Sequence, residues 1–232
     1  IFLSLLTSVS LADSDKVEKM LSGFVSVDRA SGTIVKSWKE DNKYWSYVLT
    51  AHHVIAKKIK SSSIEGDFFE FSDRGEISYS QRIFGKVVWH NTKYDVAILK
   101  YETWKLFPTA EVIPPKQSKD FGLFDKVFSV GLPNLEKIYC TEGLISTLNA
   151  KGNQGVLGFF GHSSCSHFGN SGGPIYNEYG QQIGVNLRIS AYDPNTRRAT
   201  GKTVISHIAY AVPLSRVFEL LGPELVEEYF DI

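Results

Sequence analysis

The chain has 232 residues, with 25 basic and 25 acidic side chains and a formal net charge of +0 at pH 7. This balance argues against a dedicated nucleic-acid-binding protein, which usually carries a basic excess. A hydrophobic content of 43% is ordinary for a globular protein, and no apolar run is long enough for a transmembrane helix. Fifteen Phe, eleven Tyr and nineteen Gly favour many short strands joined by turns.

The first twelve residues differ from the rest because they are uncharged and largely apolar. They end in Ser10-Leu11-Ala12, a small-x-small pattern typical of a secretory cleavage site. A short buried N-terminal segment is the alternative. We expect residues 1–12 to be a signal-peptide remnant and the protein to be secreted or periplasmic. In an oxidising compartment the two cysteines, Cys140 and Cys165, can pair or stay free.

Short strand-like segments follow along the chain. Before residue 107 they lie at 23–27, 30–35, 44–50, 68–71, 77–88 and 95–100. After residue 121 they lie at 126–130, 137–140, 143–148, 156–160, 174–177, 182–186 and 203–212. Between the two groups, prolines mark a linker, and residues 213–230 have the apolar spacing of one closing helix.

This pattern predicts an all-β protein with two β-barrels or sandwiches of similar size. We place the N-terminal domain at 13–110, the linker at 111–121, the C-terminal domain at 122–212 and the closing helix at 213–232.

In the glycine-rich turn Gly169–Pro174 (GNSGGP), Ser171 lies between a Gly-Asn pair and a Gly-Gly pair. Glycines allow positive φ and a sharp turn, which can aim successive amides at one anion-binding spot. A serine hydroxyl beside such a nest suits acyl transfer, although such runs are often plain turns. Catalysis would also need a base and an acid that orients it.

Candidates for both groups lie upstream of the turn. His52 and His53 lie where a strand ends, and Asp95 begins an apolar strand, so its carboxylate would lie at a barrel rim. A carboxylate in such a place persists only when it is hydrogen-bonded or paired, and an imidazole N–H is a suitable partner.

Three segments in this order resemble the motifs of trypsin-fold serine proteases. Residues 47–54 (YVLTAHHV) resemble the histidine motif, 94–99 (YDVAIL) the aspartate motif, and 169–174 the serine motif. Further segments at 30–33, 131–133, 142–146, 184–186 and 209–213 are similar to landmarks of the HtrA-like branch. The resemblance covers about residues 23–221. It implies two six-stranded Greek-key β-barrels packed face to face, with a catalytic cleft between them.

The resemblance also implies a role for each matching residue. His53 would be the general base, Asp95 the orienting acid and Ser171 the nucleophile. The backbone amides of Gly169 and Ser171 would form the oxyanion hole. The protein is thus expected to be a serine endopeptidase that acts on polypeptides, without a metal or cofactor.

Cys165 lies six residues before Ser171. The resemblance implies that this position forms the floor of the primary specificity pocket. It offers no charge for a basic substrate residue, so we expect a small or apolar residue before the scissile bond. The alternative is that a nearby histidine, His162 or His167, accepts an acidic side chain. The expected pocket residues are Cys165, Ser166, His167, Asn186 and Leu187.

Two departures and two rival interpretations complete the prediction. Asn170 stands where trypsin has the aspartate that pairs with a newly cut N-terminus, so no such activation step is expected. The resemblance to the HtrA-like branch covers the protease domain, and we expect no PDZ domain. One rival is an α/β-hydrolase with Ser171, Asp193 and His207, and the other is a catalytically silent binding module.

Overall fold

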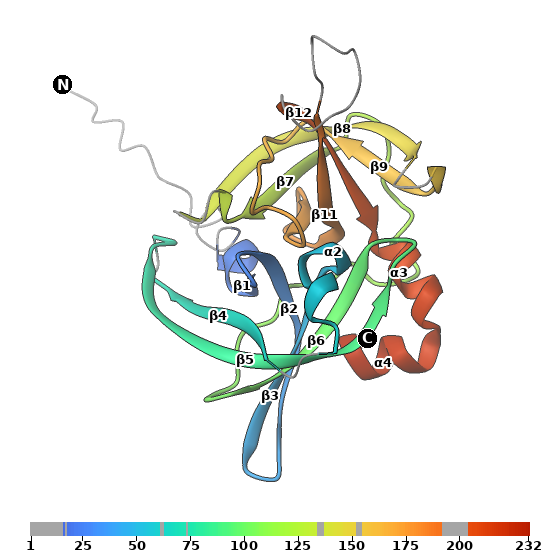
Figure 1. The fold of residues 1–232 in the computed structure, drawn as a ribbon. Coiled ribbons are helices and arrows are strands. Elements are labelled where there is room, and N and C mark those ends of the chain that lie inside the picture. The colour runs from blue at the N-terminus through green and yellow to red at the C-terminus, as the bar shows by residue number, and fades with distance from the viewer. Residues whose placement is uncertain are drawn as a thin grey trace, which may run out of the picture.

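The computed structural model describes residues 16, 18–60, 63–72, 74–133, 137–151, 155–191 and 204–232, without side chains at 189–191 and 204–207. The predicted signal-peptide remnant and Asp193 lie outside these residues. Most of the described chain is in strands, and the strands form two closed barrels (Figure 1). The prediction of an all-β fold with two six-stranded barrels is therefore confirmed.

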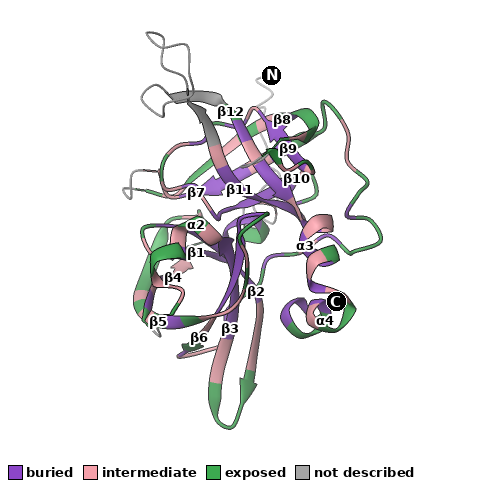
Figure 2. Cartoon of the chain, turned by 45° about the vertical axis from the view of Figure 1, so that its right-hand side comes forward, coloured by how far each residue is buried: buried purple, intermediate pink, exposed green. Residues whose placement is uncertain are grey.

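The N-terminal barrel closes in the order β1-β2-β3-β6-β5-β4, and neighbouring strands are antiparallel. Its strands are β1 (Phe24–Val27), β2 (Ala30–Glu40), β3 (Lys43–Ala51), β4 (Ile64–Phe71), β5 (Ile77–Asn91) and β6 (Val96–Thr103). The tip of the long β2–β3 hairpin is exposed, whereas the strand ends nearer the second barrel are buried (Figure 2).

The C-terminal barrel closes in the order β10-β11-β12-β9-β8-β7. Its strands are β7 (Lys126–Gly131), β8 (Tyr139–Ala150), β9 (Phe159–His162), β10 (Pro174–Asn177), β11 (Gln182–Ala191) and β12 (Val204–Pro213). The two strands predicted between residues 137 and 148 are one strand, β8, because β7 and β9 pair along it in succession.

Short helices follow β3 and β12. The first helices are α2 (His52–Ile55) and the 3₁₀ turn η1 (Ala56–Lys58). The single closing helix is a wrong prediction, because the chain forms α3 (Leu214–Leu221) and α4 (Pro223–Phe230). Gly222 has φ of 75°, outside the right-handed helical region, and Pro223 begins the next helix at a position that needs no N–H donor. No helix in the described ranges is long and apolar enough to span a membrane.

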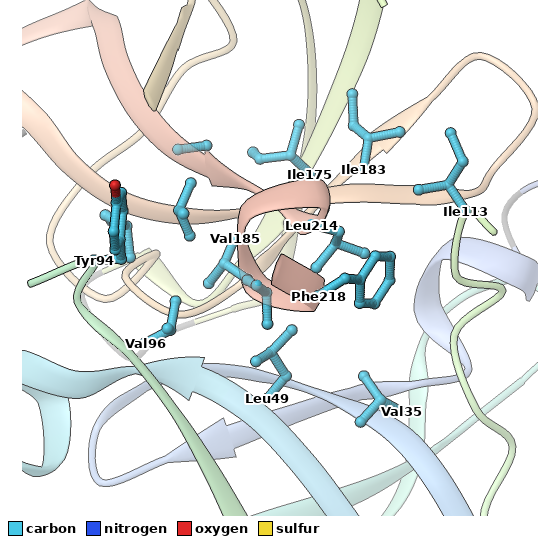
Figure 3. Close-up of a cluster of buried hydrophobic side chains, with 14 of the residues drawn as sticks. Val35, Leu49, Tyr94, Val96, Ile113, Ile175, Ile183, Val185, Leu214 and Phe218 are labelled. Atoms are coloured by element: carbon cyan, nitrogen blue, oxygen red, sulfur yellow. The ribbon is translucent and has the colours of Figure 1, made fainter. Parts of the chain in front are cut away.

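One hydrophobic cluster joins the two barrels (Figure 3). Leu49 and Val96 come from the N-terminal barrel, Ile175 and Val185 from the C-terminal barrel, and Phe218 from α3. All five side chains are buried, so the two halves share a core instead of meeting through a polar surface. This shared core fixes β3 and β6 relative to β10 and β11, the strands that flank the candidate site.

Candidate active site

The register of two neighbouring strands brings His53 and Asp95 together. Ala51, the last residue of β3, pairs with Val96, the first residue of β6. His53 therefore lies just after the end of β3, and Asp95 lies just before the start of β6. His53 Nδ1 lies 2.7 Å from Asp95 Oδ2, and the His53 amide donates to Asp95 Oδ1 at 2.8 Å.

The bonds to Asp95 fix both the carboxylate and the imidazole. The Asp95 side chain is 13% exposed, whereas the His53 side chain is 46% exposed. A buried carboxylate requires such partners, and Asp95 takes the left-handed conformation, with φ of 58°, that lets it face α2. When Nδ1–H donates to the carboxylate, Nε2 is left with a lone pair that can accept a proton.

The neighbouring His52 has a different environment. Its ring lies 5.2 Å from the ring of exposed His90, and its Nε2 is buried with no hydrogen-bond partner among the described residues. Burial lowers the pKa of His52, against an opposing effect of Asp95. The structure thus brings His53, and not His52, to the carboxylate.

Ser171 lies on the turn that enters β10. Its Oγ donates to the carbonyl oxygen of Leu187 at 3.1 Å, and in the described residues no hydrogen bond joins it to His53. The nucleophile candidate and the base candidate are therefore each hydrogen-bonded, but to different partners.

The residues before Ser171 form a tight turn. The Asn170 amide donates to the His167 carbonyl at 3.1 Å, and Gly169, the third residue of this turn, has φ of 101°. A positive φ at the third position is the mark of a type II turn, which favours glycine there. Among the described residues, the amides of Gly169 and Ser171 have no hydrogen-bond acceptor. Two free amides on one turn are suitable donors for an oxyanion.

Gly172 packs directly against the N-terminal barrel. It has φ of 84°, and a Cβ atom there would overlap Thr50 Oγ1 and the Ser31 carbonyl oxygen. Both contacts come from the N-terminal barrel, whose strands β2 and β3 carry these residues. Only glycine therefore lets the turn approach the strand that leads to His53.

The predicted pocket residues do not share one environment. Asn186 is buried, and its amide group donates to Ser166 Oγ at 2.8 Å and to Ser129 Oγ at 3.4 Å. Cys165 is exposed, and Thr141 donates to its carbonyl. The other two predicted residues are His167, whose Nδ1 is buried without a partner among the described residues, and Leu187, which accepts the bond from Ser171.

The two cysteines are not paired. Cys140 and Cys165 are both free and exposed, so the disulfide considered from the sequence is absent. Cys140 follows the pleat of β8 to the face opposite that of its neighbour Thr141, and it is Thr141 that contacts the backbone of Cys165. Among the described residues, no group of three or more His, Cys, Asp or Glu side chains could hold a metal ion.

Two buried polar residues near the site were not among the predicted site residues. Ser31, on β2, makes hydrogen bonds to the serine turn. His162, on β9, is fully buried, with Nδ1 at 2.6 Å from Ser164 Oγ. The segment around Ser31 matched a landmark of the resembling family, and His162 is one of the two histidines that the sequence placed close to the predicted pocket, but neither residue was given a role from the sequence.

Comparison with known proteins agrees with this geometry. A family model for the trypsin-like peptidase domain matches residues 22–185, well over half of the chain. The chain belongs to this family. A probable periplasmic DegP-like serine endoprotease of Hahella chejuensis is 29% identical over 147 residues, which are 62% of this chain and 27% of the relative. Protease Do-like 5, chloroplastic, of Arabidopsis thaliana is 25% identical over 226 residues, 90% of this chain and 64% of the relative.

The peptidase-domain chain thus spans about a quarter of the length of its DegP-like relative. Among solved structures, the MamO protease domain of Magnetospirillum magneticum has a TM-score of 0.65 at 20% identity and covers 88% of this chain and 98% of its own. The Deg5 structure has a TM-score of 0.64 at 21% identity and covers 89% and 90%. These structures share the fold. Similarity to the DegP-like and Do-like relatives supports the predicted HtrA-like protease domain. The strand that follows Ser171 excludes the α/β-hydrolase alternative.

Proposed function

We propose that this chain is a serine endopeptidase in which His53, Asp95 and Ser171 form the catalytic triad. The observation that carries the proposal is the 2.7 Å contact between His53 Nδ1 and Asp95 Oδ2. A carboxylate at this distance favours the tautomer with the proton on Nδ1, which leaves Nε2 free to act as a general base. Membership of the trypsin-like peptidase family and similarity to DegP-like serine endoproteases support the same activity.

In the proposed mechanism, a peptide substrate displaces the Ser171 hydroxyl from the Leu187 carbonyl. His53 Nε2 then takes the hydroxyl proton while Oγ attacks the scissile carbonyl, and Asp95 stabilises the imidazolium. The amides of Gly169 and Ser171 donate to the oxyanion. His53 passes its proton to the leaving amine, and water hydrolyses the acyl-enzyme in a second, equivalent step.

A non-basic residue before the scissile bond fits the proposed pocket. Cys165 supplies no carboxylate, and Ser166 and Asn186 are neutral residues that bond to each other. We therefore propose a preference for small or apolar residues there. Cleavage-site profiling in a proteome-derived peptide library tests this proposal, and a dominant preference for Lys or Arg would contradict it.

An extracytoplasmic location is also proposed. It rests on the apolar segment 1–12 and on the periplasmic location given in the name of the DegP-like relative. Fractionation of cells that express the full-length protein tests it, and recovery from the cytoplasm alone would contradict it.

A catalytically silent binding module remains the second candidate, because Ser171 Oγ bonds to Leu187 O and not to His53. A fluorophosphonate probe separates the two. The peptidase proposal expects Ser171 to be labelled in the parent protein, with the label lost in His53→Ala. Absence of labelling and of casein hydrolysis in the folded parent protein would favour the binding module.

A further inference from the structure

Ser31 connects the N-terminal barrel to the turn that carries Ser171. It lies on β2, and no part of it is exposed to solvent. Its hydroxyl donates to the Gly169 carbonyl at 2.7 Å and accepts from the Leu132 amide at 3.1 Å. Both hydrogen-bonding roles of the hydroxyl are thus filled by backbone groups of the other barrel and the segment that follows β7.

The peptide group between Gly169 and Asn170 is held from both sides by these contacts. Its carbonyl oxygen accepts from Ser31 Oγ, and its N–H donates to the His167 carbonyl at 3.1 Å. This peptide group links the two amides, those of Gly169 and Ser171, that are free to bind an oxyanion. Its orientation therefore sets the direction of both donors.

The peptide group between Ser171 and Gly172 is held in the same way. The Ser171 carbonyl accepts from the Ser31 amide at 2.9 Å, and the Gly172 amide donates to the Asn186 carbonyl at 2.7 Å. In each case the C-terminal barrel binds the N–H and Ser31 binds the C=O. Ser31 thus fixes the backbone on either side of Asn170 and Ser171.

Ser31 is also bonded to the strand that leads to His53. Its carbonyl accepts from Thr50 Oγ1 at 2.8 Å, and Thr50 lies on β3 three residues before His53. One buried residue therefore contacts both the oxyanion turn and the strand of the general base.

We propose that Ser31 is a positioning residue for the oxyanion site, and this inference rests on the proposed peptidase function. Its hydroxyl holds the Gly169 carbonyl and so keeps the two donor amides aimed at one point. Without the hydroxyl, the Gly169 carbonyl loses its partner, and the turn is free to rotate its donors away from the oxyanion. The backbone bond from the Ser31 amide to the Ser171 carbonyl does not depend on the side chain.

Ser31→Ala tests the proposal because it removes the hydroxyl and leaves that backbone bond. A misplaced donor weakens transition-state binding, so we expect kcat on a peptide substrate to fall about 10- to 100-fold with KM changed less than about threefold. A peptide aldehyde inhibitor, which forms a tetrahedral oxyanion on Ser171, should lose affinity in parallel. A purely structural role would lower thermal stability and leave kcat of the folded fraction and aldehyde affinity unchanged.

Thr33→Val is the matched control. Thr33 lies two residues further along β2, is fully buried, and its hydroxyl has no hydrogen-bond partner among the described residues. Removal of this hydroxyl should leave kcat within about twofold of the parent value, since it touches no part of the turn. An equal loss of kcat in both variants would overturn the role of Ser31.

Ser31→Cys provides a second variant if Ser31→Ala does not fold. It keeps nearly the side-chain volume but replaces a strong hydrogen-bond donor with a weak one. A kcat below about a third of the parent value would support the inference, and a higher kcat in either folded variant would overturn it. Fluorophosphonate labelling of the parent protein tests the proposed function separately, so failure of that function is distinguishable from failure of the role of Ser31.

Discussion

The two barrels hold their parts of the candidate site through different kinds of bond. In the N-terminal barrel, the Asp95 carboxylate binds both the ring and the amide of His53. In the C-terminal barrel, the Ser171 turn is held by backbone groups, and Ser31 of the N-terminal barrel binds two of its carbonyls. The candidate base is therefore oriented by a carboxylate, whereas the candidate nucleophile is placed by hydrogen bonds to the backbone of its turn. Removal of the Asp95 charge should therefore disable the His53–Asp95 pair, whereas an added side-chain atom should disrupt the Ser171 turn.

The largest effect is expected when the nucleophile itself is removed. Ser171→Ala should lower kcat/KM on a peptide substrate by about 10⁵-fold or more and leave the fold intact. The reason is that the proposed base and oxyanion donors act only together with the Ser171 hydroxyl. Activity assays and circular dichroism check this. Ser163→Ala, in the segment before the turn, is the control and should keep activity. Retained hydrolysis in Ser171→Ala would refute the triad.

Removal of the orienting charge should have the next largest effect. Asp95→Asn keeps the shape of the side chain but does not stabilise the imidazolium and favours the wrong tautomer, so kcat should fall about 10⁴-fold. Asp67→Asn is the control, because Asp67 on β4 forms an ion pair with Arg82 on β5 at the surface. Parent-level kcat in Asp95→Asn would mean that the contact with His53 is only structural.

A change of shape at the turn should reduce stability. Gly172→Ala would overlap Thr50 Oγ1 and the Ser31 carbonyl, so we expect a loss of at least about 3 kcal/mol of unfolding free energy. Gly222→Ala is the matched control, because Gly222 also has positive φ but its Cβ would meet no atom within 4 Å. It should lose only about 1 kcal/mol from backbone strain. Equal losses, measured by urea unfolding, would show that the contact between barrels contributes nothing.

His162 should give the smallest effect, and that effect depends on pH. Unlike His53, it has no carboxylate partner among the residues that the structure describes. Burial lowers its pKa to about 4, although Asn186 acts against this. Between pH 6.5 and 4 the unfolded chain takes up a proton that the folded protein does not, so stability falls as the pH falls. The contribution of buried His162 to the free energy of unfolding is therefore full above pH 6.5 and is lost progressively below that pH.

His162→Gln removes this titrating group. Between pH 7 and pH 5 its unfolding free energy should fall by about 2 kcal/mol less than that of the parent protein. Urea unfolding at both pH values measures the difference, and exposed His90→Gln is the control. The same pH dependence in parent and His162→Gln would contradict the lowered pKa.

Much of the site was predictable because its constraints are local. The glycines around Ser171 require backbone conformations that few other residues adopt, and Asp95 at the start of an apolar strand needs a partner. The alternation of apolar residues also located most strands. These features depend on residue type and short spacing, which the sequence contains directly.

The closing helix and the cysteines illustrate the limits of that reasoning. The apolar spacing of residues 213–230 outweighed the Gly222-Pro223 break, so two helices were predicted as one. The relation of Cys140 to Cys165 depends on which face of β8 each residue meets, and this requires the register of β8 with its neighbours.

The sequence alone determined which residue types could carry the chemistry, because a nucleophile, a base and a carboxylate are recognisable within short motifs. Only the tertiary structure decided what holds them. The bond from Ser171 to Leu187, the hydrogen bonds between His53 and Asp95, and the contacts of Ser31 with the turn all join segments that are separated in the chain. Such contacts follow from how two closed barrels pack on a shared core, and no local pattern encodes that packing.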